Sequence, residues 1–281
     1  MLKQRLITAF ILIALVLWGI LRLPTHYLAL VFAVVILQGG WEWGGLMKLP
    51  SVYWKATFIG VLAISMLGLW FMVDKDKSDW LALPVVSLFW WVLTFIWVLS
   101  YPKTAQHWSN YFIQFLAGFL ILIPAWSSII GLRVYGDLGP YLVLYLLSLI
   151  WVADTGAYFG GRWLGKHKLA PAVSPGKTWE GVFSAFIFTV IYALGVTYFL
   201  DALGNQWLAF VVLSQVTVIF SILGDLAESM FKRHAGVKDS SNILPGHGGL
   251  LDRIDSLTAA APVFVVGLWL GGFSLGGGNV S

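Results

Sequence analysis

The sequence predicts an all-α polytopic membrane protein with about nine transmembrane helices. Three observations support this prediction: the apolar composition, the scarcity of charge and the length of the apolar runs. Hydrophobic residues make up 59% of the 281 residues and charged residues 11%, whereas about 25% are charged in an average soluble domain. Sixteen Trp and nineteen Phe exceed what one soluble body of this size can bury. A freely soluble globular protein is therefore excluded.

Nine apolar runs divide the chain, each close to the roughly 20 residues that a helix needs to cross a bilayer core. They span residues 6–23, 27–47, 56–74, 81–100, 110–132, 140–158, 179–200, 206–224 and 256–271. Residues 10–18 and 85–97 are apolar on all sides, whereas the strands of a membrane barrel alternate apolar and polar residues. The runs therefore predict helices.

The first run begins like a secretory signal peptide, because Lys3 and Arg5 precede it. Residues 21–24 offer no small-residue cleavage site. We therefore expect a retained membrane helix.

The distribution of Lys and Arg predicts the orientation, since positively charged loops stay on the cytoplasmic side. With a cytoplasmic N-terminus, thirteen of the seventeen basic residues fall on the inner side. The four on the outer side are Arg22, Lys75, Lys77 and Arg133. Nine crossings then leave the C-terminus external.

Polar residues gather in two inner segments, predicted as cytoplasmic loops 154–180 and 225–255. We divide the chain accordingly into N-terminal transmembrane helices, residues 1–135, and a C-terminal catalytic region, residues 136–281. The second loop holds four Asp, one Glu, four Lys or Arg and two His.

This second loop begins and ends with a pair of carboxylates spaced i, i+3: Asp225 with Glu228, and Asp252 with Asp255. On a helix, each pair shares one face. Ionised groups at the membrane boundary are costly unless paired or bound to metal, and Mg²⁺ prefers oxygen ligands. The pattern therefore predicts a Mg²⁺ site at all four acids. In the alternative interpretation the acids only pair with the basic residues of a solvated loop, namely Lys232, Arg233, Lys238 and Arg253.

Cysteine is absent, which excludes disulfides, thiolate nucleophiles and Cys-based metal sites. The formal net charge is +4, but the basic residues are spread over many short segments. This spread favours membrane orientation over nucleic-acid binding, so no nucleic-acid partner is expected.

Two short segments could hold phosphate. In residues 244–249, Gly246, Gly248 and Gly249 leave the backbone free to approach a ligand closely; a flexible turn is the alternative. His247 could donate to phosphate, ligate metal or hold the turn.

The other segment, residues 174–178, ends like a P-loop, but Pro171 stands where that pattern requires Gly. Ser174, Lys177 and Thr178 remain as an anion cradle at the amino end of the helix that begins at Trp179. The predicted inner face thus combines carboxylates for a metal, cations and flexible backbone. This combination favours phosphoryl transfer as the function.

Residues 229–233, 238–239 and 245–255 resemble the signature of the phosphatidate cytidylyltransferases, also called CDP-diacylglycerol synthases. Residues 174–181 are similar to a second motif of that family, although Gly176 stands where a further Lys is common. The resemblance implies that CTP and phosphatidate give CDP-diacylglycerol and pyrophosphate. It also implies dependence on Mg²⁺, with a second, monovalent cation such as K⁺ beside it. It further implies a homodimer among the lipids of a bacterial inner membrane, with its active site on the cytoplasmic face.

The resemblance makes Asp225 and Asp252 the principal metal ligands, with Glu228 and Asp255 nearby. We expect the phosphate of phosphatidate to attack the α-phosphorus of CTP in line, without a strong general base. The expected catalytic residues are Asp225, Asp252, Lys232, Arg233, Lys238, Arg253 and His247. The expected substrate-binding residues are Ser174, Lys177, Thr178, Ser229, Asp239, Gly246, Gly248 and Gly249.

Two other classes of protein fit the sequence less well. Mg²⁺-dependent membrane transferases of the CDP-alcohol phosphotransferase or prenyltransferase type carry Asp motifs of different spacing, which this sequence lacks. Transporters bind solutes near the bilayer midplane, where these runs have few ionisable groups.

Overall fold

Long apolar helices make up most of the computed structural model, which describes residues 13–72, 79–199, 201–244, 246 and 248–273. Eight of the helices in this part of the chain are long and apolar enough to cross a membrane. They are α2 (Thr25–Leu46), α3 (Val52–Met72), α4 (Ala82–Ser100), α6 (Tyr111–Arg133), α7 (Gly139–Leu164), α8 (Trp179–Phe199), α9 (Trp207–Ala235) and α10 (Leu251–Leu270). The predicted all-α polytopic fold is confirmed.

The first predicted span is described only in part, as a shorter apolar helix, Ile13–Arg22. Its residues 6–12, with Lys3 and Arg5 before them, lie outside the described part of the chain. Short 3-10 or α-helical turns join the long helices. They are η1 (Asp79–Leu81), α5 (Ala105–Trp108), η2 (Gly136–Leu138) and η3 (Asp201–Gln206).

A two-stranded antiparallel hairpin joins α7 to α8, formed by β1 (Lys168–Ala170) and β2 (Ser174–Thr178). Lys168 lies opposite Thr178, and Ala170 opposite Ser174. The sequence did not predict these strands, because β2 contains Pro175 and Gly176, which are poor strand formers. Proline is tolerated here because both strands are edge strands. The start of α8 at Trp179 agrees with the prediction.

Two helices continue beyond the apolar runs that predicted them. Helix α7 extends to Leu164 rather than 158, and α9 extends to Ala235 rather than 224. Residues 225–235 are therefore helical, and only residues 236–250 connect α9 to α10. An apolar run shows only which part of a helix contacts lipid. The backbone hydrogen bonds of the helix can continue into residues that are polar. Helix α9 ends at Ala235, and Gly236, with a φ of 77°, forms a left-handed cap after it.

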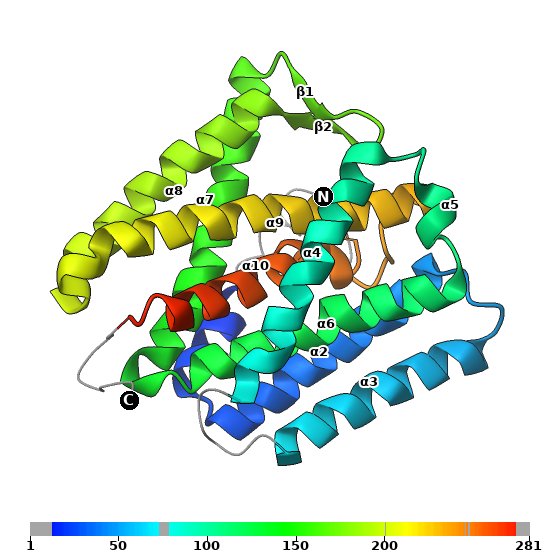
Figure 1. Cartoon of the computed structure of the whole chain (residues 1–281), viewed down its shortest axis with the longest axis horizontal. Helices are drawn as coiled ribbons and strands as arrows, with labels where there is room; N and C mark the ends of the chain where they lie inside the picture. Colours follow the sequence, from blue (N-terminus) through cyan, green and yellow to red (C-terminus); the bar gives the residue numbers. More distant parts are fainter. Residues whose placement is uncertain (1–12, 73–78, 200, 245, 247, 274–281) are drawn as a thin grey trace.

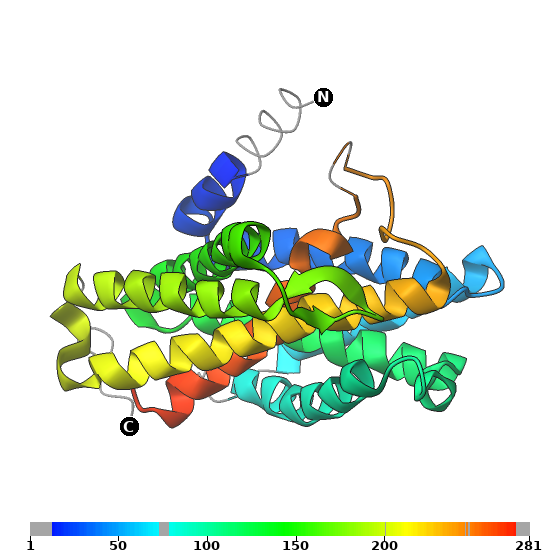
Figure 2. The same ribbon diagram turned by 90° about the horizontal axis from the view of Figure 1, so that it is seen from above.

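Helices α6 and α10 are the most buried of the long helices, whereas α3 and α8 are the most exposed. Figure 1 shows α9 lying along α10, with α7 and α8 forming a pair that carries the hairpin. Viewed from above, the hairpin crosses the carboxyl-terminal half of α9 (Figure 2). The exposed apolar side chains of α3 and α8, such as Phe71 and Ile191, are suited to contact lipid.

Candidate active site

Helix α9 places several of the predicted residues on one face, three and four positions apart. The Ser229 hydroxyl donates to Asp225 Oδ1 at 3.3 Å, and Lys232 Nζ lies 2.5 Å from Glu228 Oε2. This i, i+4 spacing brings side chains of successive turns together. The apolar pattern alone would have ended the helix before these residues.

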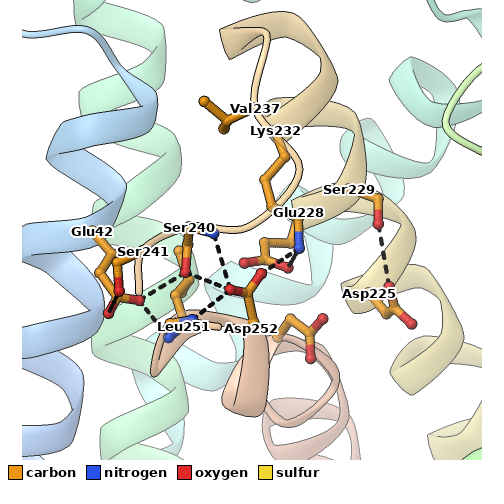
Figure 3. Close-up of polar contacts among 12 residues, drawn as sticks. Glu42, Asp225, Glu228, Ser229, Lys232, Val237, Ser240, Ser241, Leu251 and Asp252 are labelled. Carbon is orange, nitrogen blue, oxygen red and sulfur yellow. Dashed lines mark hydrogen bonds and ion pairs between the residues drawn. The ribbon is translucent and has the colours of Figure 1, made fainter. Parts of the chain in front are cut away.

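Asp252, in the first turn of α10, faces this side of α9. Its Oδ1 lies 2.5 Å from Lys232 Nζ, and its Oδ2 accepts the backbone N–H groups of Ser240 at 2.9 Å and Gly249 at 2.8 Å. Figure 3 shows Lys232 between Glu228 and Asp252. We call Glu228, Lys232 and Asp252 the buried ion triad, because their side chains are only 4–9% exposed. Such charges are tolerated in an interior only when paired.

Asp225 belongs to a second, more open group. Its Oδ2 lies 2.6 Å from Nζ of Lys177 on β2, and the two side chains are 31% and 26% exposed. Asp255 and Asp154 lie close enough to Asp225 to interact with it electrostatically. We call Asp154, Asp225 and Asp255 the open acidic group. The hairpin therefore brings residues 174–178, which were predicted to hold phosphate, to Asp225 and Asp255 of the predicted loop 225–255.

The cluster offers carboxylate oxygens, the kind of ligand that a hard divalent cation prefers. The acids of the triad and the open group outnumber the neighbouring bases Lys177, Lys232 and Arg253. Within the described residues, Glu228 Oε1 is buried without a hydrogen-bond partner, so one carboxylate oxygen is available to a ligand. No three Asp, Glu or His side chains of the described residues converge on one point in this geometry. Lys177 and Lys232 instead hold the oxygens of Asp225, Glu228 and Asp252.

Other predicted residues have contacts within the chain itself. Arg233 donates from Nε to the Val173 carbonyl at 3.2 Å, which ties α9 to the hairpin. Thr178 Oγ1 accepts the N–H of Gly181 at 3.2 Å and so caps α8. Ser174 is half-buried in β2.

The loop between α9 and α10 carries the remaining predicted residues. Lys238 and Asp239 are exposed there. Gly246 and Gly248 adopt the positive φ values, 76° and 80°, that favour glycine, and Gly249 approaches Asp252. Pro245 and His247 lie outside the described residues.

Sequence reasoning missed two acids that the structure brings to the site. One is Asp154, which it assigned to a loop. The other is Glu42 on α2, which is 3% exposed and accepts hydrogen bonds from the loop and from the start of α10. A lone acid within an apolar run was a usable signal, because a charge in a membrane helix is rare and is usually functional.

The structure contains an apolar cavity of about 650 Å³. It lies between α4, α8, α9 and the hairpin, and its lining includes Phe95, Val173, Trp179, Phe220 and Leu226. Leu226 directly follows Asp225 on α9. The cavity is therefore bounded by α9 and the hairpin, the two elements that carry Asp225 and Lys177, and by the membrane-spanning helices α4 and α8.

Comparisons with known proteins identify the family of the chain. The model of the cytidylyltransferase family matches residues 3–270. The phosphatidate cytidylyltransferase of Pseudomonas aeruginosa is 42% identical over 97% of this chain and 99% of its own length. That of Haemophilus influenzae is 43% identical over 94% and 97%, and that of Staphylococcus aureus is 38% identical over 78% and 80%. Because the family match runs through nearly the whole chain and includes every residue of the site described above, this protein belongs to the cytidylyltransferase family.

Proposed function

We propose that this chain is a phosphatidate cytidylyltransferase, which converts CTP and phosphatidate to CDP-diacylglycerol and pyrophosphate. The observation that carries the proposal is the charged cluster at the junction of α9, α10 and the hairpin, where Lys177 meets Asp225 and Lys232 joins Glu228 to Asp252. The full-length relatives that bear this name support it.

In the reaction, a phosphate oxygen of phosphatidate forms a bond to the α-phosphorus of CTP. The bond from that phosphorus to the β-phosphate oxygen breaks, and pyrophosphate leaves with the electron pair. The attacking oxygen is already anionic near neutral pH, so a strong general base is unnecessary. We expect Lys177, Lys232 and Arg253 to neutralise phosphate charge, and arginine can bind phosphate by two parallel contacts.

Asp225, Asp252, Glu228 and Asp255 would hold Mg²⁺. The bound ion would neutralise charge on the phosphate oxygens. The excess of acids over bases and the unpartnered Oε1 of Glu228 among the described residues support this assignment. K⁺ remains a candidate for a second cation, and a homodimer is the assembly that the family resemblance favours.

The apolar cavity is our candidate for the acyl chains of phosphatidate. Its lining includes Trp179 and Leu226, which follow Thr178 of the hairpin and Asp225 of α9 in the sequence. Acyl chains entering from the bilayer would lose little solvation there, because the lining is as apolar as the lipid. CTP would come from the water on the other side of the cluster.

We further propose that the site faces the cytoplasm of a bacterial inner membrane. The excess of Lys and Arg on the inner segments supports this orientation. The carboxyl-terminal parts of α2 and α9 contact the start of α10, and Asp154 of α7 lies near Asp225 and Arg253, as strictly alternating spans require.

The experiment that tests the function uses the full-length chain purified in detergent with phosphatidate, labelled CTP and Mg²⁺. We expect labelled CDP-diacylglycerol, loss of activity with a chelator and recovery when Mg²⁺ is restored. Asp225→Asn and Asp252→Asn should each lower the rate by about 10²-fold or more, the order reported for removal of one transition-state contact. Near wild-type turnover in both variants contradicts the metal assignment.

The same preparation separates the rival classes. Conversion of CDP-diacylglycerol and an alcohol, without use of CTP, indicates a CDP-alcohol phosphotransferase. Solute uptake by proteoliposomes without nucleotide turnover indicates a transporter.

A further inference from the structure

Glu42 is the acid of the site that lies farthest away in sequence. It lies near the end of α2, and both of its carboxylate oxygens are occupied. Oε1 accepts from Ser241 Oγ at 2.7 Å and from the N–H of Leu250 at 3.0 Å. Oε2 accepts from Ser240 Oγ at 2.8 Å and from the N–H of Leu251 at 2.7 Å. Figure 3 shows these contacts beside Asp252.

Two of these contacts hold the amino end of α10. The first N–H groups of a helix have no partner within the helix, and an anion at this end is favoured by the helix dipole. Glu42 accepts the N–H groups of Leu250, the residue that precedes the helix, and of Leu251, its first residue. A side chain of α2 thus fixes the helix turn from which Asp252 projects.

A third contact reaches Asp252 through one hydroxyl group. Ser240 Oγ lies 2.8 Å from Glu42 Oε2 and 2.9 Å from Asp252 Oδ2. Because a serine hydroxyl has one proton, the two carboxylates share this donor. Ser241 also donates to Glu42, at 2.7 Å.

Gly249 shows how closely this network is packed. A Cβ at Gly249 would lie 2.0 Å from Ser240 Oγ and 2.5 Å from Glu42 Oε2. Only glycine therefore lets the backbone N–H at this position reach Asp252 while Glu42 is in place.

We infer that Glu42 is a positioning residue for Asp252, acting through the amino end of α10 and through Ser240. The inference rests on the proposed function, in which Asp252 acts at the reacting phosphates. Misplacement of a catalytic group by about 1 Å can lower a rate by about 10²-fold, so loss of this support should reduce turnover without removing any group that contacts substrate.

The test compares Glu42→Gln with the wild-type chain in two measurements. The first is backbone amide exchange of the peptide that covers residues 240–252, measured without metal or nucleotide. We expect faster exchange at Leu250 or Leu251, because the glutamine NH₂ group cannot accept the N–H group that faces it. We also expect faster exchange at Gly249, whose N–H donates to Asp252, because the start of α10 is held less firmly. The second is steady-state kinetics, where we expect kcat to fall by about tenfold or more while KM for phosphatidate stays within about twofold.

Two serine variants provide the matched comparison, since each removes one hydroxyl donor to Glu42. Ser240→Ala also removes the contact with Asp252 and should lower kcat more than Ser241→Ala. Asn110→Ala, which removes the side chain that accepts the Ile113 N–H at the start of α6, controls for general loss of a helix cap. It should leave the exchange of residues 240–252 unchanged.

Equal kcat values for the two serine variants, or unchanged exchange and turnover in Glu42→Gln, would overturn the inference. If Glu42→Gln does not fold, the kcat values of Ser240→Ala and Ser241→Ala test the inference. An inactive wild-type chain counts against the proposed function instead, and the exchange measurement still tests the contact between Glu42 and α10.

Discussion

Lys232 forms ion pairs with both buried acids, Glu228 on α9 and Asp252 on α10. Its ammonium group lies 2.5 Å from an oxygen of Glu228 and 2.5 Å from an oxygen of Asp252. Since neither acid is well exposed, removal of the lysine leaves two unpaired carboxylates in the interior.

We predict that Lys232→Met destabilises the chain by about 3–5 kcal/mol, the range measured when one partner of a buried ion pair is removed. Thermal unfolding in detergent measures this loss. Lys238→Met is the control, because Lys238 is exposed in the loop and its replacement should leave the unfolding temperature unchanged. Equal unfolding temperatures for the two variants count against the buried ion triad.

Lys177 tests whether the hairpin takes part in nucleotide binding. Lys177→Ala should raise KM for CTP by about tenfold, because a charge-assisted contact to phosphate contributes about 1.5–3 kcal/mol. Steady-state kinetics against CTP measures it. Lys168→Ala on β1, where the side chain is exposed, should leave KM unchanged. Unaltered CTP kinetics in Lys177→Ala removes the hairpin from the site.

At the scale of elements, the close packing of α7 against α8 sets the position of the hairpin. A Cβ at Gly160 would lie 2.2 Å from Ser184 Cβ, so these helices approach through a residue without a side chain, as membrane helices often do. The hairpin joins the two helices at this end, and it carries Lys177 to Asp225.

Gly160→Ala should therefore lower both the unfolding temperature and the turnover, because α7 and α8 must separate to admit the methyl group. Gly195→Ala is the matched control in α8, since none of the described atoms lies within 4 Å of the new methyl position. Similar unfolding temperatures and rates for the two variants contradict this account of the helix pair.

For the whole molecule, the orientation in the membrane can be tested directly because the chain lacks cysteine. Gln106→Cys and Asn205→Cys place single thiols at exposed positions on opposite sides in the proposed topology. A membrane-impermeant maleimide added to spheroplasts should label Asn205→Cys at once and Gln106→Cys only after the membrane is permeabilised. The reverse pattern means that the site faces the outside.

The sequence predicted the elements better than it predicted their ends. Apolar runs located eight helices of the described chain, because residues that face lipid must be apolar along the whole crossing. The same criterion ended α9 at residue 224 and so assigned Asp225 and Lys232 to a loop. Hydropathy could not detect that these polar residues continue a helix whose polar face is covered by α10 and the hairpin.

The sequence by itself determined that the chain crosses a membrane, and its motifs indicated which acids and bases carry the chemistry, because composition and spacing are local properties. Only the tertiary structure decided that Lys177 joins Asp225, that Lys232 lies between Glu228 and Asp252, and that Glu42 holds the start of α10. Lys232 and Glu228 are only four residues apart, but Lys232 and Asp252 are 20 residues apart and Glu42 and Leu251 are 209 residues apart. Packing between helices, which no local pattern encodes, brings them together.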